Sequence, residues 1–352
     1  MLKQIRRATL HLLRRSGVFG LVGNSRWRSQ RILILCYHGI SQEDEHLWRP
    51  SLYMQPRVLQ ERLELLRRGG YNVLPLGEGL RRLQTGELPP RSVAITFDDG
   101  GFDFYKQAYP VLKSYGFPVT VYQSTYHSDH STPIFNLICS YMLWKRRSVP
   151  LDNGAEMGLD QPMDLSTETG RRRIVRKLVV RSEAENMTGA QKNKLAAQLA
   201  GLLGIDYEEL LSKRILQLMN PGEIAELAAE GVDFQLHTHR HRTPSDEPSF
   251  RKEIQDNRRR IEEITSVRAL HFCYPSGVYE ARFLPWLKAE EILSATTCDN
   301  GLATPQTNPL LLPRFVDTSA KSTLEFESWM TGVGALLAFR QTAPQTYASQ
   351  RD

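Results

Sequence analysis

Short apolar runs of β type alternate with helical stretches along most of this chain, and this alternation limits the folds open to it. Runs at 32–37, 71–76, 93–95, 119–122, 232–236 and 311–316 are rich in Val, Ile, Leu and aromatic residues, and each predicts a strand. Helical stretches lie between them, as at 105–115 and in the segment from Pro56, where Leu59, Leu63 and Leu66 share one face. Repeated strand–helix units predict parallel βα units, and in such folds functional residues gather where the strands end.

Two motifs stand at predicted strand ends. Thr96-Phe97-Asp98-Asp99-Gly100 follows one apolar run, and His237-Thr238-His239-Arg240-His241 follows another about 140 residues later. Alone, the first is typical of a solvated turn or helix cap, and the second is typical of an incidental histidine pair. Together they supply one Asp and two His, the ligand set of a hydrolytic metal site, with the second Asp free to act as a base.

These motifs resemble those of the polysaccharide deacetylases, whose shared catalytic region is the NodB homology domain. The resemblance covers roughly residues 31–318. It rests on the Thr-Phe-Asp-Asp-Gly and His-Thr-x-x-His signatures and on the later Tyr274-Pro275-Ser276-Gly277, which is similar to the family's Pro-Tyr-Gly loop. The segments Tyr37-His38 and Gly116-Phe117-Pro118-Val119-Thr120 fit as well.

The resemblance implies an α/β fold, an irregular (β/α) barrel, usually of seven strands. It implies that Asp99, His237 and His241 hold a divalent metal and that Asp98 is the general base. Zinc is the metal we expect, with cobalt, nickel or manganese as alternatives for the same ligands. Water would attack an acetamide carbonyl, and a backbone N–H near Ser276 would stabilise the oxyanion. We expect Tyr274, Pro275, Ser276 and Gly277 to bind the substrate.

Two features depart from the family pattern. The Arg that often precedes the Pro-Tyr-Gly loop and orients the catalytic Asp is missing, and Arg268 lies too early to replace it. The C-terminal Leu-x-His segment has no His, because the matching region reads Leu-Leu-Pro-Arg-Phe at 311–315. We therefore expect His38 to be the general acid, as in an exopolysaccharide branch of the family. The alternative is a loop histidine bonded for structure. Arg314 and Asp317 are weaker candidates for the pocket lining.

Positive charge is concentrated at the start of the chain. Residues 1–31 carry eight Lys or Arg and no acid, and removing them from the net +6 leaves −2. A near-neutral body argues against a nucleic-acid partner. We expect residues 1–30 to form a basic amphipathic segment on an anionic membrane surface, or else a disordered tail. With no convincing signal peptide or cysteine pairing pattern, a cytoplasmic protein, peripheral at the inner face of the membrane, is expected.

The rest of the chain predicts one catalytic domain at 31–330, with a helical insertion at about 135–218 and a C-terminal tail at 331–352. The expected function is removal of an N-acetyl group from a sugar in a polysaccharide or lipid-linked glycan precursor. Two alternatives remain. One is a deformylase or other amide hydrolase on the same fold, and the other is a catalytically weak glycan-binding or membrane-binding protein.

Overall fold

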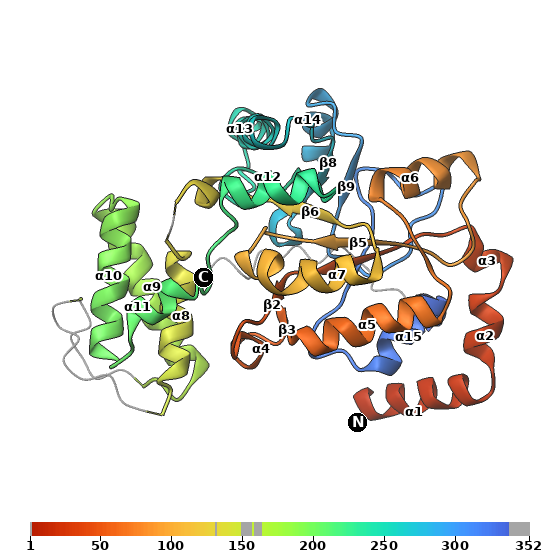
Figure 1. Cartoon of the computed structure of the whole chain (residues 1–352), viewed down its shortest axis with the longest axis horizontal. Helices are drawn as coiled ribbons and strands as arrows, with labels where there is room; N and C mark the ends of the chain where they lie inside the picture. Colours follow the sequence, from red (N-terminus) through yellow and green to blue (C-terminus); the bar gives the residue numbers. More distant parts are fainter. Residues whose placement is uncertain (1, 131, 149–156, 158–163, 338–352) are drawn as a thin grey trace. The chain divides into compact units, whose positions relative to one another are not determined.

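The computed structural model describes residues 2–130, 132–148, 157 and 164–337 (Figure 1). Its chain divides into two compact units. The first runs up to Gly100 and includes Phe104–Tyr126 and the chain from Pro221 onward. The second comprises Gly101–Asp103 and His127–Asn220. All of the sequence-predicted site residues belong to the first unit.

The first unit is built on one parallel sheet with the strand order β10-β1-β5-β6-β7-β8-β9, and β4 pairs with the start of β5. Its strands are β1 (Leu33–Tyr37), β4 (Asn72–Val73), β5 (Ser92–Phe97), β6 (Thr120–Gln123), β7 (Asp233–Leu236), β8 (His271–Cys273), β9 (Ser294–Thr296) and β10 (Phe315–Val316). Every residue of β1, β5 and β6 is buried, as expected for strands covered on both faces. The fold class and the seven-stranded path are confirmed.

One segment reaches both edges of this sheet. Phe315 and Val316 pair with β1, while Leu312, three residues earlier, forms a bridge with Thr296 of β9. The sheet is therefore curled, and Leu312–Val316 forms the seam where its edges approach. The predicted strand 311–316 shortens to two residues here, because the segment changes partner halfway along. A small second sheet pairs β2 (Gly39–Ile40) with β3 (Tyr53–Met54) just after β1.

Helices of the first unit follow the predicted βα rhythm. They are α4 (Glu45–Trp48), α5 (Pro56–Arg68), α6 (Leu76–Thr85), α7 (Tyr109–Tyr115), α12 (Pro221–Ala229), α13 (Glu247–Thr265) and α14 (Phe283–Ala289). A π-helical turn at Phe104–Ala108 precedes α7. Helix α5 begins at Pro56 and buries Leu59, Leu63 and Leu66, the stripe expected from the sequence. The strand predicted at 71–76 is short because α6 already begins at Leu76.

The start of the chain is helical, in α1 (Leu2–Arg15), α2 (Val18–Gly23) and α3 (Arg26–Ser29). Leu10 and Phe19 pack with Leu324 and Val333 from α15 (Thr323–Thr331) and α16 (Val333–Leu337). Figure 1 shows α1 beside the C-terminal helices. No helix in the described residues is both long and apolar enough to cross a bilayer. The predicted tail begins within this region, and its residues 338–352 lie outside the described part.

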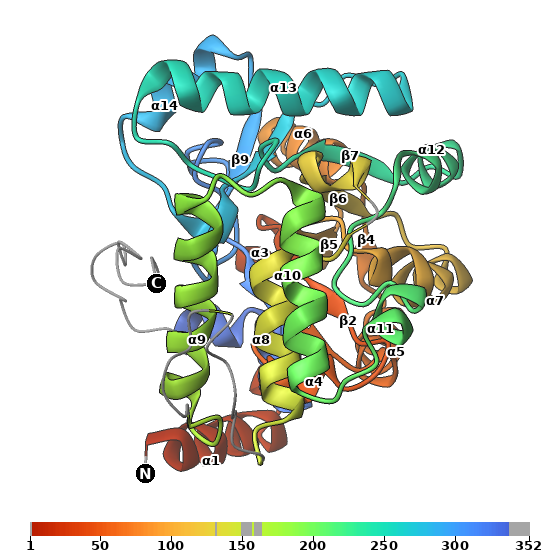
Figure 2. The same cartoon turned by 90° about the vertical axis from the view of Figure 1, so that its left-hand side faces the viewer.

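The second unit is helical. It contains α8 (Phe135–Lys145), α9 (Glu168–Ala184), α10 (Gly189–Leu202) and α11 (Tyr207–Ser212), with α8, α9 and α10 side by side (Figure 2). Helix α8 buries Ile138, Tyr141 and Leu143, and α10 buries Leu195 and Leu199. These side chains give the unit its own apolar core.

Candidate active site

The two carboxylates of the Asp-Asp motif face one opening because the chain turns sharply between them. Strand β5 ends at Phe97, and the Asp98 N–H still donates to the Tyr37 carbonyl at 2.9 Å. Asp99 then takes the left-handed conformation, with φ of 73°. Gly100 follows at φ of 80°, where a Cβ would lie 2.0 Å from Gln123 Oε1. Only glycine fits there, but Asp99 bears part of the strain itself.

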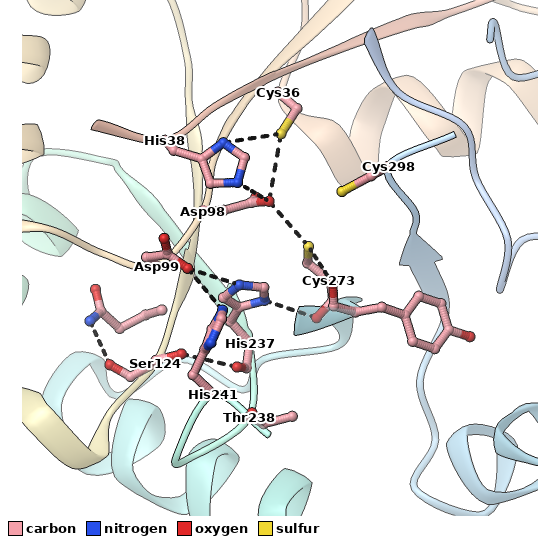
Figure 3. A network of polar contacts seen from close by, with 12 residues as sticks. Cys36, His38, Asp98, Asp99, Ser124, His237, Thr238, His241, Cys273 and Cys298 are labelled. Atoms are coloured by element: carbon pink, nitrogen blue, oxygen red, sulfur yellow. Dashed lines mark hydrogen bonds and ion pairs between the residues drawn. The ribbon is translucent and has the colours of Figure 1, made fainter. Parts of the chain in front are cut away.

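Asp99, His237 and His241 bring their ligand atoms together. Asp99 Oδ1 lies 3.2 Å from His237 Nε2 and 3.1 Å from His241 Nε2. All three ligand atoms are within 4.8 Å of one another. His241 has φ of 54°, so a second strained residue turns its side chain inward from the loop after β7. Figure 3 shows both imidazoles pointing toward Asp99.

Hydrogen bonding at His237 sets which of its nitrogens is free. His237 is buried, and Nδ1 lies 2.9 Å from the Cys273 carbonyl oxygen, which can only accept. Nδ1 therefore carries the proton, and in the neutral ring Nε2 turns a lone pair toward Asp99. Two acceptors 3.2 Å apart require a proton or a cation between them.

The pKa shifts of Asp99 and His237 agree with this requirement. Partial burial would raise the pKa of Asp99, but the facing imidazoles of His241 and His237 outweigh it and hold this pKa well below its ordinary value. Burial would lower the pKa of His237, yet its hydrogen bond to Asp99 raises that pKa overall. The cluster therefore favours positive charge at its centre.

The donor set fits a divalent metal. Two imidazole nitrogens and one carboxylate oxygen suit zinc, and its bond lengths of about 2.0–2.1 Å place tetrahedral ligand atoms about 3.3 Å apart. The Asp99–histidine separations of 3.1 and 3.2 Å agree with that spacing. Three protein ligands also leave a position open, as in catalytic rather than structural zinc sites.

Asp98 is held by an arginine that lies far away in the sequence. Arg314 Nη1 donates to Asp98 Oδ1 and Nη2 donates to Oδ2, both at 2.7 Å. Both side chains are buried, at 0% and 3% exposure. Burial would raise the pKa of Asp98, but the Arg314 guanidinium lowers it well below its ordinary value. Arg314 thus makes, from a different place in the sequence, the kind of contact with Asp98 that is expected of the missing family Arg.

His38 is a second basic side chain close to the Asp98 carboxylate. Its Nε2 is 3.7 Å from Asp98 Oδ2, too long for a hydrogen bond but close enough for an ion pair when the ring is protonated. The thiols of Cys36 and Cys273 also face Oδ2, at 3.5 and 3.4 Å. Figure 3 shows this group next to the Asp99 cluster. The site therefore has two groups of side chains, one around Asp99 and one around Asp98, joined through the Asp98–Asp99 peptide.

Asn257 of α13 fixes the backbone beneath the ligand histidines. It is fully buried, accepts from the His237 N–H, and donates to the Gln123 carbonyl and the Thr125 hydroxyl, each at 2.9 Å. The Thr125 hydroxyl also contacts His239 Nδ1 at 2.9 Å, so His239 does not join the ligand cluster. One amide thus holds the ends of β6 and β7 together.

The four residues of the loop at 274–277, all expected to bind the substrate, differ in how far they are exposed. Ser276 is exposed and left-handed, with φ of 56°, whereas Pro275 and Gly277 are buried. Tyr274 is fully buried, and its hydroxyl donates to the Leu310 carbonyl at 2.9 Å. Its phenol is therefore already bonded within the protein, so a substrate contact would use its backbone.

Comparison with known proteins agrees with the geometry. The family model for polysaccharide deacetylase matches residues 85–157 and 189–292, just over half of the chain. The chain belongs to the polysaccharide deacetylase family. This is a family of hydrolases that cleave carbon–nitrogen bonds other than peptide bonds. The match includes Asp98, Asp99, His237 and His241, while His38 and Arg314 lie outside it.

Individual relatives are similar over shorter lengths. YxkH of Bacillus subtilis (strain 168) is 35% identical over 106 residues, which is 29% of this chain and 36% of YxkH. The poly-beta-1,6-N-acetyl-D-glucosamine N-deacetylase of Escherichia coli (strain K12) is 27% identical over 100 residues, 28% of this chain and 14% of that protein. The matched region thus spans about a third or less of either relative.

Solved structures share the fold at low identity. The Streptococcus pyogenes deacetylase PplD, in complex with acetate, superimposes with a TM-score of 0.55 at 20% identity, covering 86% of this chain and 98% of PplD. IcaB from Ammonifex degensii gives a TM-score of 0.53 at 16% identity, covering 86% of this chain and 97% of IcaB. These likenesses concern architecture.

Proposed function

We propose that this protein is a metal-dependent hydrolase that removes the N-acetyl group from an N-acetylated sugar in a polysaccharide or a lipid-linked glycan precursor. The observation that carries the proposal is the convergence of Asp99, His237 and His241 beside a buried, arginine-bound Asp98. The family supplies the reaction class. The E. coli relative, which acts on a polymer of N-acetyl-D-glucosamine, supports an acetylated amino sugar as substrate.

In this proposal Asp99, His237 and His241 hold the metal, most simply zinc, with cobalt, nickel or manganese as alternatives. A divalent cation held there would polarise the amide carbonyl and acidify a nearby water. Asp98 takes a proton as the water oxygen bonds to the carbonyl carbon. His38 then protonates the nitrogen as the carbon–nitrogen bond breaks, leaving acetate and a free amino sugar. The exposed loop at Ser276 would supply a backbone N–H to the oxyanion.

The same site suits neighbouring reactions. Hydrolysis of an N-formyl group or of a small cyclic amide would need the same base, acid and metal. The alternative enzyme would therefore differ from a deacetylase only in the acyl group that it removes. A glycan-binding or membrane-binding protein would have no use for a base beside a ligand triad. We place the reaction at the cytoplasmic face of the membrane, where lipid-linked glycans are accessible. The four free cysteines support a reducing compartment.

The first test is metal content per chain, measured by elemental analysis of purified wild type and His241→Ala. We expect close to one equivalent in the wild type and its loss in the variant. Acetate and formate release from N-acetylated and N-formylated glucosamine oligomers would follow, with Asp98→Asn as the variant that keeps metal and loses turnover. Formate release alone would favour the deformylase.

A metal-supplemented wild type that retained no metal after desalting would contradict the proposal. So would an Asp98→Asn variant with wild-type acetate release, because the proton acceptor would then be elsewhere. In the first case the binding-protein alternative would become the better account, and glycan binding would be measured directly.

A further inference from the structure

Helix α1 lies on the first unit with most of its surface exposed. Leu10 is buried at 1% exposure in the cluster with Phe19, Leu324 and Val333. Ile5 and Leu12 are instead 55% and 68% exposed. At about 100° per residue they lie about 140–160° around the helix from Leu10, so they point away from the core. Leu21 of α2 is 73% exposed. The core therefore uses one side of this segment and leaves an apolar stripe facing outward.

Basic side chains flank that stripe on both sides. At about 100° per residue, Arg6 and Arg15 lie about 110° and 70° from it in opposite directions, whereas Arg7 and Arg14 lie on the Leu10 side of the helix. Arg6, Arg7, Arg14 and Arg15 of α1 are exposed, and so is Arg26 of α3. Arg14 pairs with Glu327, whereas the other four form no ion pair with any described residue. Arg28 differs, because it is fully buried and donates to the Met330, Arg31 and Ser92 carbonyls. No acidic residue occurs before residue 43 to balance these charges.

Further positive charge lies in a groove on the Leu10 side of the helix. Arg7, His11 and Arg14 line it together with Lys321 and Ser322, around a volume of about 450 Å³. Glu61 is the one carboxylate among the described lining residues, and it already accepts from Arg57. The groove adds positive potential beside α1, which attracts an anionic surface.

We propose that α1 and α2 form a docking face for an anionic membrane leaflet, with Ile5, Leu12 and Leu21 entering the headgroup region and the arginines contacting lipid phosphates. Exposed aliphatic side chains flanked by Arg6 and Arg15, which form no ion pair with any described residue, suit an anionic bilayer, which offers both apolar volume and negative charge. A nucleic acid would use the arginines but leave the leucines in water. A second copy would place like charges together. The proposal does not depend on the deacetylase activity.

The test is co-sedimentation of the whole chain with sucrose-loaded vesicles. One set is phosphatidylcholine alone and the other contains about one-third phosphatidylglycerol. We expect binding to the anionic vesicles only, weakened by salt. Arg6→Glu/Arg15→Glu should weaken this binding about tenfold or more, and Ile5→Ser/Leu12→Ser should weaken it while preserving its salt dependence.

Two matched controls test the location of the face. Arg172→Glu/Arg173→Glu makes the same charge change on exposed positions of α9, and Leu293→Ser removes a side chain that is 59% exposed after α14. Both should bind as the wild type does. Equal loss in the α9 variant would overturn the proposal by showing a non-specific charge effect. Absence of vesicle binding would also overturn the proposal. Tight binding to a mixed-sequence DNA duplex would then assign the face to a nucleic acid, and a dimer at the same protein concentration would assign it to a second copy.

Discussion

Arg314 is the residue whose role depends most on the three-dimensional structure. It lies 216 positions from Asp98 in the chain, yet it meets both carboxylate oxygens at 2.7 Å. Both side chains are buried, so the guanidinium is what keeps a carboxylate ionised there. The motif positions could be predicted because each motif is local. The Asp98–Arg314 pair could not, because it depends on how the sheet closes, although one cation in the apolar run 310–316 was a usable signal.

We predict that Arg314→Met lowers kcat by about 100-fold, because a buried base that loses its bidentate partner loses its position. Removing one partner of a buried ion pair should also lower the free energy of unfolding by about 3–5 kcal/mol. Arg314→Lys keeps the positive charge, so it should be more stable than Arg314→Met. It should recover little of kcat, because lysine cannot donate to both carboxylate oxygens as the planar guanidinium does. Acetate-release kinetics and thermal unfolding measure the two effects. Equal kcat in both variants and wild type would remove Arg314 from the mechanism.

His38 gives a second prediction at this scale. His38→Gln should reduce kcat by about 100-fold or more, the usual contribution of a general acid, while the metal content stays unchanged. The reason is that His38 faces Asp98 and is outside the Asp99 cluster. Elemental analysis alongside kinetics separates it from His241→Ala, which should lose metal and turnover together. If His38→Gln also lost its metal, His38 would have to be reassigned to the ligand set.

At the scale of elements, the βα alternation could be predicted, because buried parallel strands are continuous apolar runs and helices carry apolar stripes. Strand lengths could not. Residues 71–76 and 311–316 are apolar enough for full strands, but α6 begins early in the first and the second divides its pairing between β9 and β1. Both outcomes are set by neighbours distant in sequence.

A buried ion pair joins α5 to the chain after β10. Arg62 Nε donates to Asp317 Oδ2 at 2.9 Å, and both side chains are almost fully buried. Burial raises the pKa of Asp317 from 3.8 to about 6, although Arg62 opposes this. The folded state therefore binds a proton more tightly than the unfolded state does. Stability due to this group is present below about pH 4 and is lost as the pH rises to about 6.

The difference in unfolding free energy between wild type and Asp317→Asn should change across that window. A shift of about two pKa units corresponds to about 3 kcal/mol in all, and the wild type should lose about 2 kcal/mol of this relative to the variant between pH 4 and 6.5. Urea unfolding at a series of pH values measures it, and acids that titrate in both proteins cancel. A pH-independent difference would show that Asp317 stays ionised throughout.

At the scale of the whole molecule, metal binding should stabilise the fold. The proposed ligands come from two separate strand ends, so a bound cation would tie β5 to β7 in the folded state only. At a free metal concentration of about 1,000 times Kd this amounts to about 4 kcal/mol. Chelation should therefore lower the melting temperature of the wild type and leave His241→Ala unchanged. An equal shift in both proteins would mean that the chelator acts elsewhere.

The seam at Leu312–Val316 carries Arg314 between its two pairing partners, Thr296 on one edge and β1 on the other. Its strand pairing is short, two residues of β10 against β1 and one bridge to β9, so we expect the sheet to fray here before it unfolds as a whole. Each such opening would withdraw the guanidinium from Asp98. Amide exchange along this segment should then be faster than in β5, and turnover should fail at a lower denaturant concentration than the helices do.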